Sequence, residues 1–230
     1  MSGAPSVAWL EQQWNERQLR ASPRRAAWRL WLYDAPAVVL GCSQPRLAAG
    51  ARGDLQLLLR RSGGGAVLAG PWMLGLSVAL PSGHALVSAS AVESYRWLGE
   101  LLGQWLRDSG IRRARAVPAG AAPVRPAAPE LDWACFASLS PWEIAAGEGK
   151  IAGLAQVRRR ELILLVAGIL LAPPDWLLLT SSLAKPPQHA AALTERSTSW
   201  AQQSGANPDR EAVAGALGRQ LAERLGGLRG

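Results

Sequence analysis

Thiol and imidazole side chains are scarce in this sequence, which has two cysteines and two histidines among 230 residues. The two thiols, Cys42 and Cys135, are too few for a disulfide framework, and their spacing is not that of zinc ligands. With only His84 and His189 as further ligand candidates, we expect no metal site. Free thiols fit a reducing compartment, so each cysteine is either a small core residue or a nucleophile.

Long apolar runs are also missing. The longest, residues 162–172, is followed by two prolines and is too short to span a bilayer. The first residues contain no basic stretch that leads into an apolar segment, so we expect neither a signal peptide nor a membrane anchor. The sequence therefore predicts a cytoplasmic protein with no membrane partner.

Lysine is rare as well, because Lys150 and Lys185 are the only two and arginine supplies the other basic residues. The net charge of +8 favours acidic partners through long-range attraction. The arginines do not cluster with aromatic residues, as a stacking surface for nucleic acid requires, so we expect no nucleic-acid partner. A hydrophobic content of 49% with 18% charged residues argues against a disordered chain.

The hydrophobic pattern alternates between the periods of helices and strands, which predicts an α+β fold with a largely antiparallel sheet. Helices are expected at residues 6–20, 89–108, 175–183 and 207–225, and strands at residues 28–33, 37–40, 55–59, 74–80 and 162–171. In the first helix, Leu10, Trp14 and Leu19 are available to one apolar side. Residues 120–129 are rich in alanine and proline and predict a loop.

Three glycine-containing segments follow one another along the chain. The first, residues 37–44, is a strand that runs into glycine and glutamine, and the second, residues 60–67, contains three consecutive glycines. The third, residues 149–159, places Lys150 between two glycines and follows a Cys135-Phe136 pair. Glycines at such positions allow a backbone or a ligand to approach closely.

The ordered set resembles the lipoate-protein ligase and octanoyltransferase family, which shares its catalytic fold with biotin-protein ligases. Weaker similarities at residues 15–16 and 196–199 extend the resemblance over most of the chain. It implies an enzyme that joins a lipoyl or octanoyl group to a lysine of a lipoyl-type carrier domain. It also implies an acidic carrier as partner and acyl carrier protein as a possible donor. Because the residues after Ser199 suffice for one helix and its connection, we expect one catalytic domain over residues 1–230 without the separate C-terminal accessory domain of many lipoate ligases.

The resemblance assigns substrate binding to the glycine-rich loop and to the segment after the lysine. The residues concerned are Arg60, Arg61, Ser62, Gly63, Gly64, Gly65, Ala66 and Val67, together with Gly153, Ala155 and Gln156. The loop can offer backbone N–H groups to a ligand because its glycines have no side chains in the way. The alternative is a plain tight turn between two strands.

Lys150 and Cys135 are the predicted catalytic residues. In the resembling enzymes the lysine contacts the reactive carbonyl and, in ligases, the phosphate of the adenylate, where an ammonium ion offsets developing negative charge. In the octanoyltransferase branch, a cysteine that precedes phenylalanine forms a thioester with the acyl group, which needs no ATP. The alternatives are a solvated surface lysine and a buried core thiol. For Cys42, which lies where the family is variable, we expect the core role.

Two departures from the family pattern concern histidines. Ala69 stands where a histidine commonly follows the loop, and Ala167 stands where a His-Gly pair is common. Both changes predict a larger or drier cavity. They leave three readings open: a cysteine-dependent transferase, an ATP-dependent ligase, and a catalytically weak relative that binds or senses an acyl group or acyl-AMP. No tightly bound cofactor is expected, and ATP with Mg²⁺ only for a ligase. Residues 158–160, three arginines, either face the carrier or form a solvated strand edge.

Overall fold

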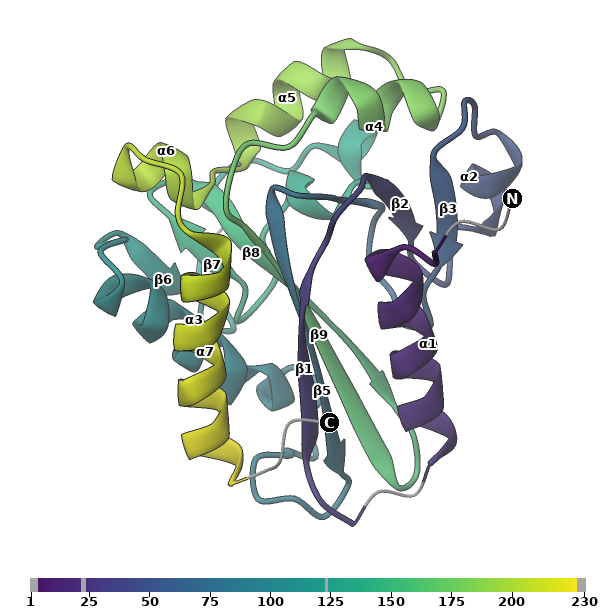
Figure 1. Cartoon of the computed structure of the whole chain (residues 1–230). Coiled ribbons are helices and arrows are strands. Elements are labelled where there is room, and N and C mark those ends of the chain that lie inside the picture. Colours follow the sequence, from purple (N-terminus) through teal and green to yellow (C-terminus); the bar gives the residue numbers. More distant parts are fainter. Residues whose placement is uncertain (1–3, 22–23, 123, 227–230) are drawn as a thin grey trace.

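The computed structural model describes residues 4–21, 24–122 and 124–226 (Figure 1). Its larger sheet has the strand order β1-β5-β9-β8-β7-β6, formed by β1 (Ala27–Leu32), β5 (Met73–Pro81), β9 (Leu162–Leu170), β8 (Gly149–Arg158), β7 (Ile144–Ala146) and β6 (Ala114–Ala116). A smaller sheet has the order β3-β2-β4, formed by β3 (Gln56–Leu59), β2 (Ala37–Leu40) and β4 (Val67–Ala69). Only the β2–β3 pair is parallel among these strands, which confirms the predicted α+β class with a mostly antiparallel sheet.

Helices flank both sheets. They are α1 (Val7–Arg20), α2 (Pro45–Ala49), α3 (Arg96–Asp108), α4 (Trp176–Ser182), α5 (Gln188–Arg196), α6 (Trp200–Ser204) and α7 (Arg210–Leu225), with short 3₁₀ turns at Glu93–Tyr95, Pro129–Leu131 and Cys135–Ala137. In Figure 1, α3 and α7 lie on one side of the sheet, and α1 with the smaller sheet lies on the other. None of these helices is long and apolar enough to cross a membrane.

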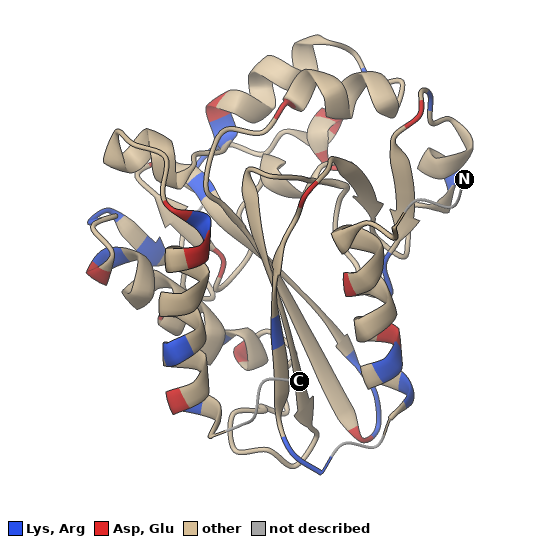
Figure 2. Ribbon diagram, viewed as in Figure 1, with Lys and Arg blue, Asp and Glu red and all other residues tan. Residues whose placement is uncertain are grey.

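Two apolar cores follow from this layering. Strand β5 is buried along eight of its nine residues because both of its faces are covered. Leu74 and Leu76 pack on the side of α3 and α7, whereas Met73 and Ala79 pack on the side of α1. Figure 2 shows the consequence, since the charged residues lie mainly on outer helices and turns and the strands are nearly free of them. The candidate functional site lies on the α1 side.

Most of the predicted elements are present, with two corrections. The third helix begins at Arg96 and not at residue 89, because the hydroxyls of Ser88, Ser90 and Ser94 bond to nearby backbone groups and hold the preceding segment in turns. Val92, which lies in this segment, is 41% exposed. Strand β8, which carries the lysine segment, was not among the predicted strands.

The second correction concerns the buried face of α1. Trp14 is buried as predicted, but Leu10 is 38% exposed and is not on the core side. The helix instead turns Glu11 and Asn15 inward, where both are more than nine-tenths buried. A buried carboxyl requires a partner, and Glu11 has one in Tyr33. The inward face of α1 is therefore set by polar as well as apolar contacts.

Candidate active site

Cys135 opens a 3₁₀ turn whose backbone is fastened to the glycine-rich loop. The amide of Ala66 donates to the carbonyl of Trp133 at 2.6 Å, and the amide of Cys135 donates to the carbonyl of Ala66 at 2.9 Å. Gly65 permits this approach, because a Cβ atom there would lie 2.5 Å from the carbonyl carbon of Ala134. The loop thus sets the position of the thiol.

Arg60 in turn holds the loop. Its buried guanidinium donates to the carbonyls of Gly63 and Gly65, each at 2.8 Å, and to the carbonyl of Val39 at 3.2 Å. Gly41 is needed at the end of β2, since a Cβ atom there would lie 2.0 Å from the carbonyl oxygen of Gly64. These contacts give the glycine run a structural role, with its carbonyls pointing at Arg60.

Lys150 lies beside the thiol and is almost fully buried, at 2% exposure. Its Nζ atom donates to the carbonyls of Cys135 and Ser138 at 2.8 and 3.0 Å and forms an ion pair with Glu143 at 2.7 Å. The Sγ atom of Cys135 is 3.8 Å from the same nitrogen. Since an ammonium has three N–H donors, the three oxygen partners leave no donor of this lysine free.

Glu143 is the counter-ion and is itself fixed by the backbone. One carboxylate oxygen accepts from the amide of Leu154 at 3.0 Å, and the other accepts from the amide of Ser140 at 2.7 Å as well as from Lys150. Trp142, which precedes it, has a φ of 69°, a left-handed conformation that is costly for a residue with a bulky side chain. This local strain accompanies the inward direction of the carboxylate.

Burial alone lowers the pKa of Lys150, but the electrostatic attraction and hydrogen bonds of the Cys135 sulfur and the Glu143 carboxylate outweigh it and raise that pKa above its usual value. The lysine is therefore an ammonium ion at neutral pH. Gly153 packs against the pair, because a Cβ atom on it would lie 3.1 Å from Cε of Lys150 and 3.3 Å from Sγ of Cys135. Thiol and ammonium thus meet over a position that has no side chain.

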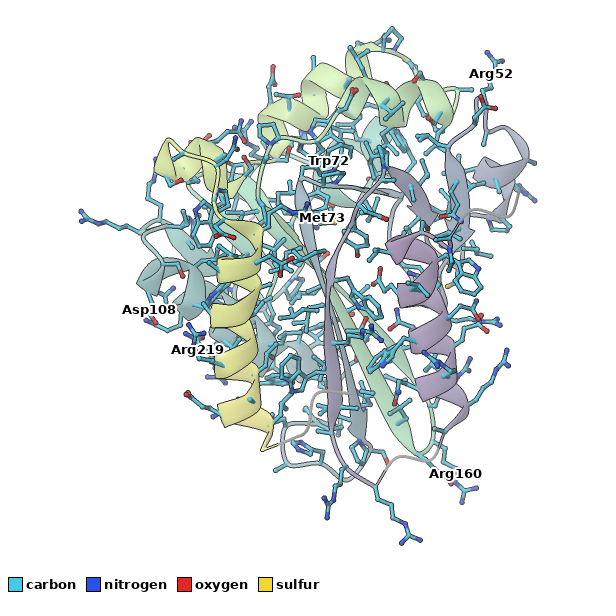
Figure 3. All side chains as sticks on the ribbon, viewed as in Figure 1. Arg52, Trp72, Met73, Asp108, Arg160 and Arg219 are labelled. Carbon is cyan, nitrogen blue, oxygen red and sulfur yellow. The ribbon has the colours of Figure 1, made fainter. Side chains whose placement is uncertain are left out.

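A cavity opens from this point between the larger sheet, α1 and the glycine-rich loop. It encloses about 660 Å³ including its open mouth. Its apolar lining comprises Val39, Val67, Ala69, Met73, Phe136, Leu154, Ala155, Leu164, Val166 and Ala167, with Gly153 and Gly168. Polar side chains from Glu11, Gln12, Asn15, Tyr33, Arg60, Arg61 and Ser62 line it too, and Cys135 completes the wall. Figure 3 places Met73 in the interior of the molecule.

The structure brings together most, but not all, of the residues that the sequence nominates. Arg60, Arg61, Ser62, Val67, Gly153 and Ala155 line the cavity with Cys135, and so do Ala69 and Ala167, the two positions without the family's histidines. Gly63, Gly64, Gly65 and Ala66 are not among the lining residues. Gln156 is not either, because its amide donates to the carbonyl of Ala91 at 2.6 Å.

Cys42 differs from expectation, whereas the arginines at residues 158–160 are exposed, which agrees with both readings of that run. Cys42 is a free and exposed cysteine, so the prediction that it lies in the core was wrong. Its backbone amide donates to the carbonyl of Ser62. Arg158 donates to the hydroxyl of Ser94 at 2.8 Å and so supports the segment before α3. Arg160 projects outward at the turn between β8 and β9 (Figure 3).

The polar end of the cavity was missed by sequence reasoning. The hydroxyl of Tyr33 donates to a carboxylate oxygen of Glu11 at 2.8 Å. Burial raises the pKa of Glu11 from 4.5 to about 7, while the bonds from Tyr33 and Asn15 and the charge of Arg60 partly oppose that rise. Burial and the nearby carboxyl also raise the pKa of Tyr33 well above 10. The available signal was two polar residues four apart on one side of the first helix.

Catalytic domains that attach cofactors to proteins share this fold. Known structures with this fold include a lipoate-protein ligase A bound with ATP, at a TM-score of 0.66 and 23% identity over 96% of this chain and 79% of that chain. Another is the bipartite lipoate protein ligase of Thermoplasma acidophilum, which is described with its E2 lipoyl domain. It has a TM-score of 0.70 and 21% identity, over 97% of this chain and 81% of that chain.

The sequence matches the model of the lipoyl protein ligase A/B catalytic domain over residues 4–222, and the chain belongs to that family. One curated relative is the octanoyltransferase LipM of Kyrpidia tusciae. It is 33% identical over 150 residues, which are 62% of this chain and 53% of that protein. The chain therefore spans about half the length of this curated relative.

Proposed function

We propose that the protein is a cysteine-dependent acyltransferase that moves an octanoyl or lipoyl group to a lysine of a lipoyl-type carrier domain. The observation that carries this proposal is the position of the Cys135 Sγ atom, which faces the cavity and lies 3.8 Å from the Lys150 ammonium. The apolar part of the cavity suits a medium-chain acyl group, and the thiol stands at the point where its carbonyl would lie.

In the first half-reaction the Cys135 sulfur attacks the carbonyl carbon of an acyl thioester, for which acyl carrier protein is the proposed donor. A new S–C bond forms, the donor's C–S bond breaks, and the thiol proton passes to the departing thiolate. Thioester exchange of this kind is nearly isoenergetic and needs no ATP. Lys150 acts here through its charge and not through a hydrogen bond to the substrate, because its three donors are occupied. Its positive charge near the sulfur offsets negative charge as it develops at the reacting carbonyl.

In the second half-reaction the amine of a carrier lysine attacks the Cys135 thioester. The C–N bond forms, the S–C bond breaks, and a proton from the amine returns to the sulfur. The positive charge of Lys150 and the negative charge of Glu143 cancel, so the buried ion pair adds no net charge to the site. Its contribution is a fixed positive end directed at the thiol and at the backbone around it.

An ATP-dependent ligase is the second candidate, since one similar structure carries ATP. In that mechanism a lysine contacts phosphate. Here all three donors of Lys150 are taken by Cys135, Ser138 and Glu143 at 2.8, 3.0 and 2.7 Å. Arg60 is likewise occupied by three loop and strand carbonyls. These two side chains therefore offer few free donors to a nucleotide, and we assign no step to ATP or Mg²⁺.

The proposed partner is a lipoyl-type domain with an acidic surface, which the chain's net charge of +8 would attract. The similar Thermoplasma ligase is described with its E2 lipoyl domain. We further propose that residues 1–230 form one catalytic domain and that it works in the cytoplasm.

The test is to incubate the protein and an isolated lipoyl domain with octanoyl-acyl carrier protein or with octanoate, ATP and Mg²⁺, and to weigh both proteins. A transferase labels the carrier from the thioester donor alone, and Cys135→Ser abolishes that labelling. Carrier labelling that requires ATP and survives Cys135→Ser would assign a ligase instead. Cys42→Ser is the matched control, because Cys42 is an exposed thiol that is not among the cavity-lining residues.

A further inference from the structure

A strip without side chains crosses the sheet beneath the cavity. Gly75 of β5 pairs directly with Gly168 of β9, and Gly168 pairs directly with Gly153 of β8. Residues that are directly opposite in neighbouring antiparallel strands share one face of the sheet. The three glycines therefore form a continuous row over three adjacent strands. Gly153 and Gly168 line the cavity, and Gly75 lies beneath the Tyr33 hydroxyl on the same face of the sheet.

Each end of this row meets a different chemical group. At Gly153 the nearest groups to an added Cβ atom are Lys150 and the Cys135 sulfur, whereas at Gly75 the nearest atom is the Tyr33 hydroxyl oxygen, at 2.3 Å. Over the middle glycine lies the flexible side chain of Met73. Neighbouring strands are about 4.8 Å apart, so the row is about 10 Å long. With bonds of about 1.5 Å, an extended chain of about eight carbons has this length.

The far end of the row is polar. Glu11, Asn15 and Tyr33 are 7%, 5% and 3% exposed, and the first two project from consecutive turns of α1. The Tyr33 hydroxyl is bonded to Glu11, but the Oδ1 atom of Asn15 is buried and has no hydrogen-bond partner among the residues that the structure describes. A buried acceptor without a donor is costly, and the cost is relieved when a ligand supplies the donor.

We propose that Glu11, Asn15 and Tyr33 form a subsite for a hydrogen-bond donor, such as a hydroxyl, at the far end of a medium-chain acyl group. This inference rests on the proposed acyl-transfer function and names its substrate class: acyl chains of about eight carbons with a polar end. A plain alkyl end would leave the Asn15 acceptor unpaired. The apolar stretch between Cys135 and Tyr33 holds the methylene groups.

Charged chain ends fit this subsite less well than neutral donors. The Glu11 carboxyl would repel a terminal carboxylate, and Arg60 has its donors engaged by the carbonyls of Val39, Gly63 and Gly65. Burial raises the pKa of Glu11 to about 7, so at neutral pH the carboxyl is protonated about half of the time. A group that is often neutral does not call for a cationic ligand end.

Binding of free acids to the unmodified protein tests the subsite separately from catalysis. We would titrate 8-hydroxyoctanoate, nonanoate as its apolar match in length, octanedioate and 8-aminooctanoate at pH 7 by calorimetry. The expected result is that 8-hydroxyoctanoate binds about five- to tenfold more tightly than nonanoate, the gain from one or two hydrogen bonds. Equal affinities, or a stronger preference for either charged end, would overturn the inference.

Variants locate the effect. Asn15→Leu should remove the hydroxyl preference, whereas Gln18→Leu, about one turn further along α1 and not among the cavity-lining residues, should keep it. Tyr33→Phe, which preserves the ring, provides the same test if Asn15→Leu fails to fold. A preference that survives both changes contradicts the proposed subsite. Octanoyl transfer without hydroxyl preference overturns this inference alone, and hydroxyl preference without transfer overturns the proposed function alone.

Discussion

The ammonium of Lys150 lies 2.7 Å from the carboxylate of Glu143, and both side chains are at most 4% exposed. Such a pair contributes little stability as a whole, but removal of one partner leaves an uncompensated buried charge. The pair connects the fold to the site, because the same ammonium holds the backbone carbonyl of Cys135. Its loss is expected to affect both stability and acyl transfer.

Glu143→Gln should lower the free energy of unfolding by about 3 kcal/mol, since the charge of Lys150 then has no counter-ion. The measurement is urea denaturation at pH 7. Glu148→Gln is the matched control, because its ion pair with Arg125 is exposed, and its loss should cost less than about 1 kcal/mol. Similar losses in the two variants would contradict the assigned role of the buried pair.

Lys150→Met should slow octanoyl transfer by about a hundredfold or more, the usual effect of removing one group that stabilises developing negative charge. The double variant Lys150→Met with Glu143→Gln removes the orphaned carboxylate and should recover stability without recovering the rate. Lys185→Met is the control, because Lys185 lies 5.5 Å from the Trp133 ring and is not a cavity-lining residue. Full activity in the double variant would remove Lys150 from the mechanism.

Gly153→Ala should reduce the rate of Cys135 acylation about tenfold while leaving the protein folded. The new methyl group would lie 3.1 Å from Lys150 Cε and 3.3 Å from the thiol, so both groups must shift by a few tenths of an ångström. Gly83→Ala is the control, since nothing lies within 4 Å of a Cβ atom there. Stopped-time mass measurement of the acylated protein gives the rate, and an unchanged rate would show that the contact is not functional.

The stability of the protein should fall as the pH rises from about 4.5 to about 7 because of Glu11. The folded state raises the pKa of this carboxyl to about 7, so over that interval the unfolded chain loses the proton while the folded chain keeps it. The loss should reach about 3 kcal/mol, at about 1.4 kcal/mol for each tenfold change in proton affinity.

Glu11→Gln cannot ionise at this position and should lack that part of the pH dependence. Urea denaturation of both proteins at pH 5 and pH 8 gives the difference. If the two proteins show the same change with pH, the carboxyl does not titrate as its burial indicates. Glu100→Gln serves as control, because Glu100 is an exposed residue of α3.

The fold was largely predictable because its strands and longer helices follow their hydrophobic periods. The exceptions have physical causes. α3 begins later than expected because serine hydroxyls before it form hydrogen bonds with the backbone. β8 was not expected because small and polar residues around Lys150 interrupt the alternating hydrophobic pattern of its sequence. The last helix buries Val213, Leu217, Leu221 and Leu225 and ends at Gly226 with a φ of 57°, as its sequence indicates.

The site was predictable only where it follows a motif. The loop, Lys150 and Cys135 could be located by order and spacing, but that Arg60 anchors the loop could not, because it depends on carbonyls brought together by folding. Glu11 and Asn15 were overlooked because a polar residue on a helix normally faces water. The row of Gly75, Gly168 and Gly153 appears only when the strand register is known.

The central claim is that Cys135 carries the acyl group between donor and carrier. The most direct measurement is to acylate the protein with an octanoyl thioester, remove the donor, and mix the product with an isolated lipoyl domain in the absence of ATP. Mass spectrometry then follows both proteins over one turnover. The account predicts that the protein loses one octanoyl group from the Cys135 peptide as the carrier lysine gains it at the same rate. An adduct that persists while the carrier remains unmodified would contradict it.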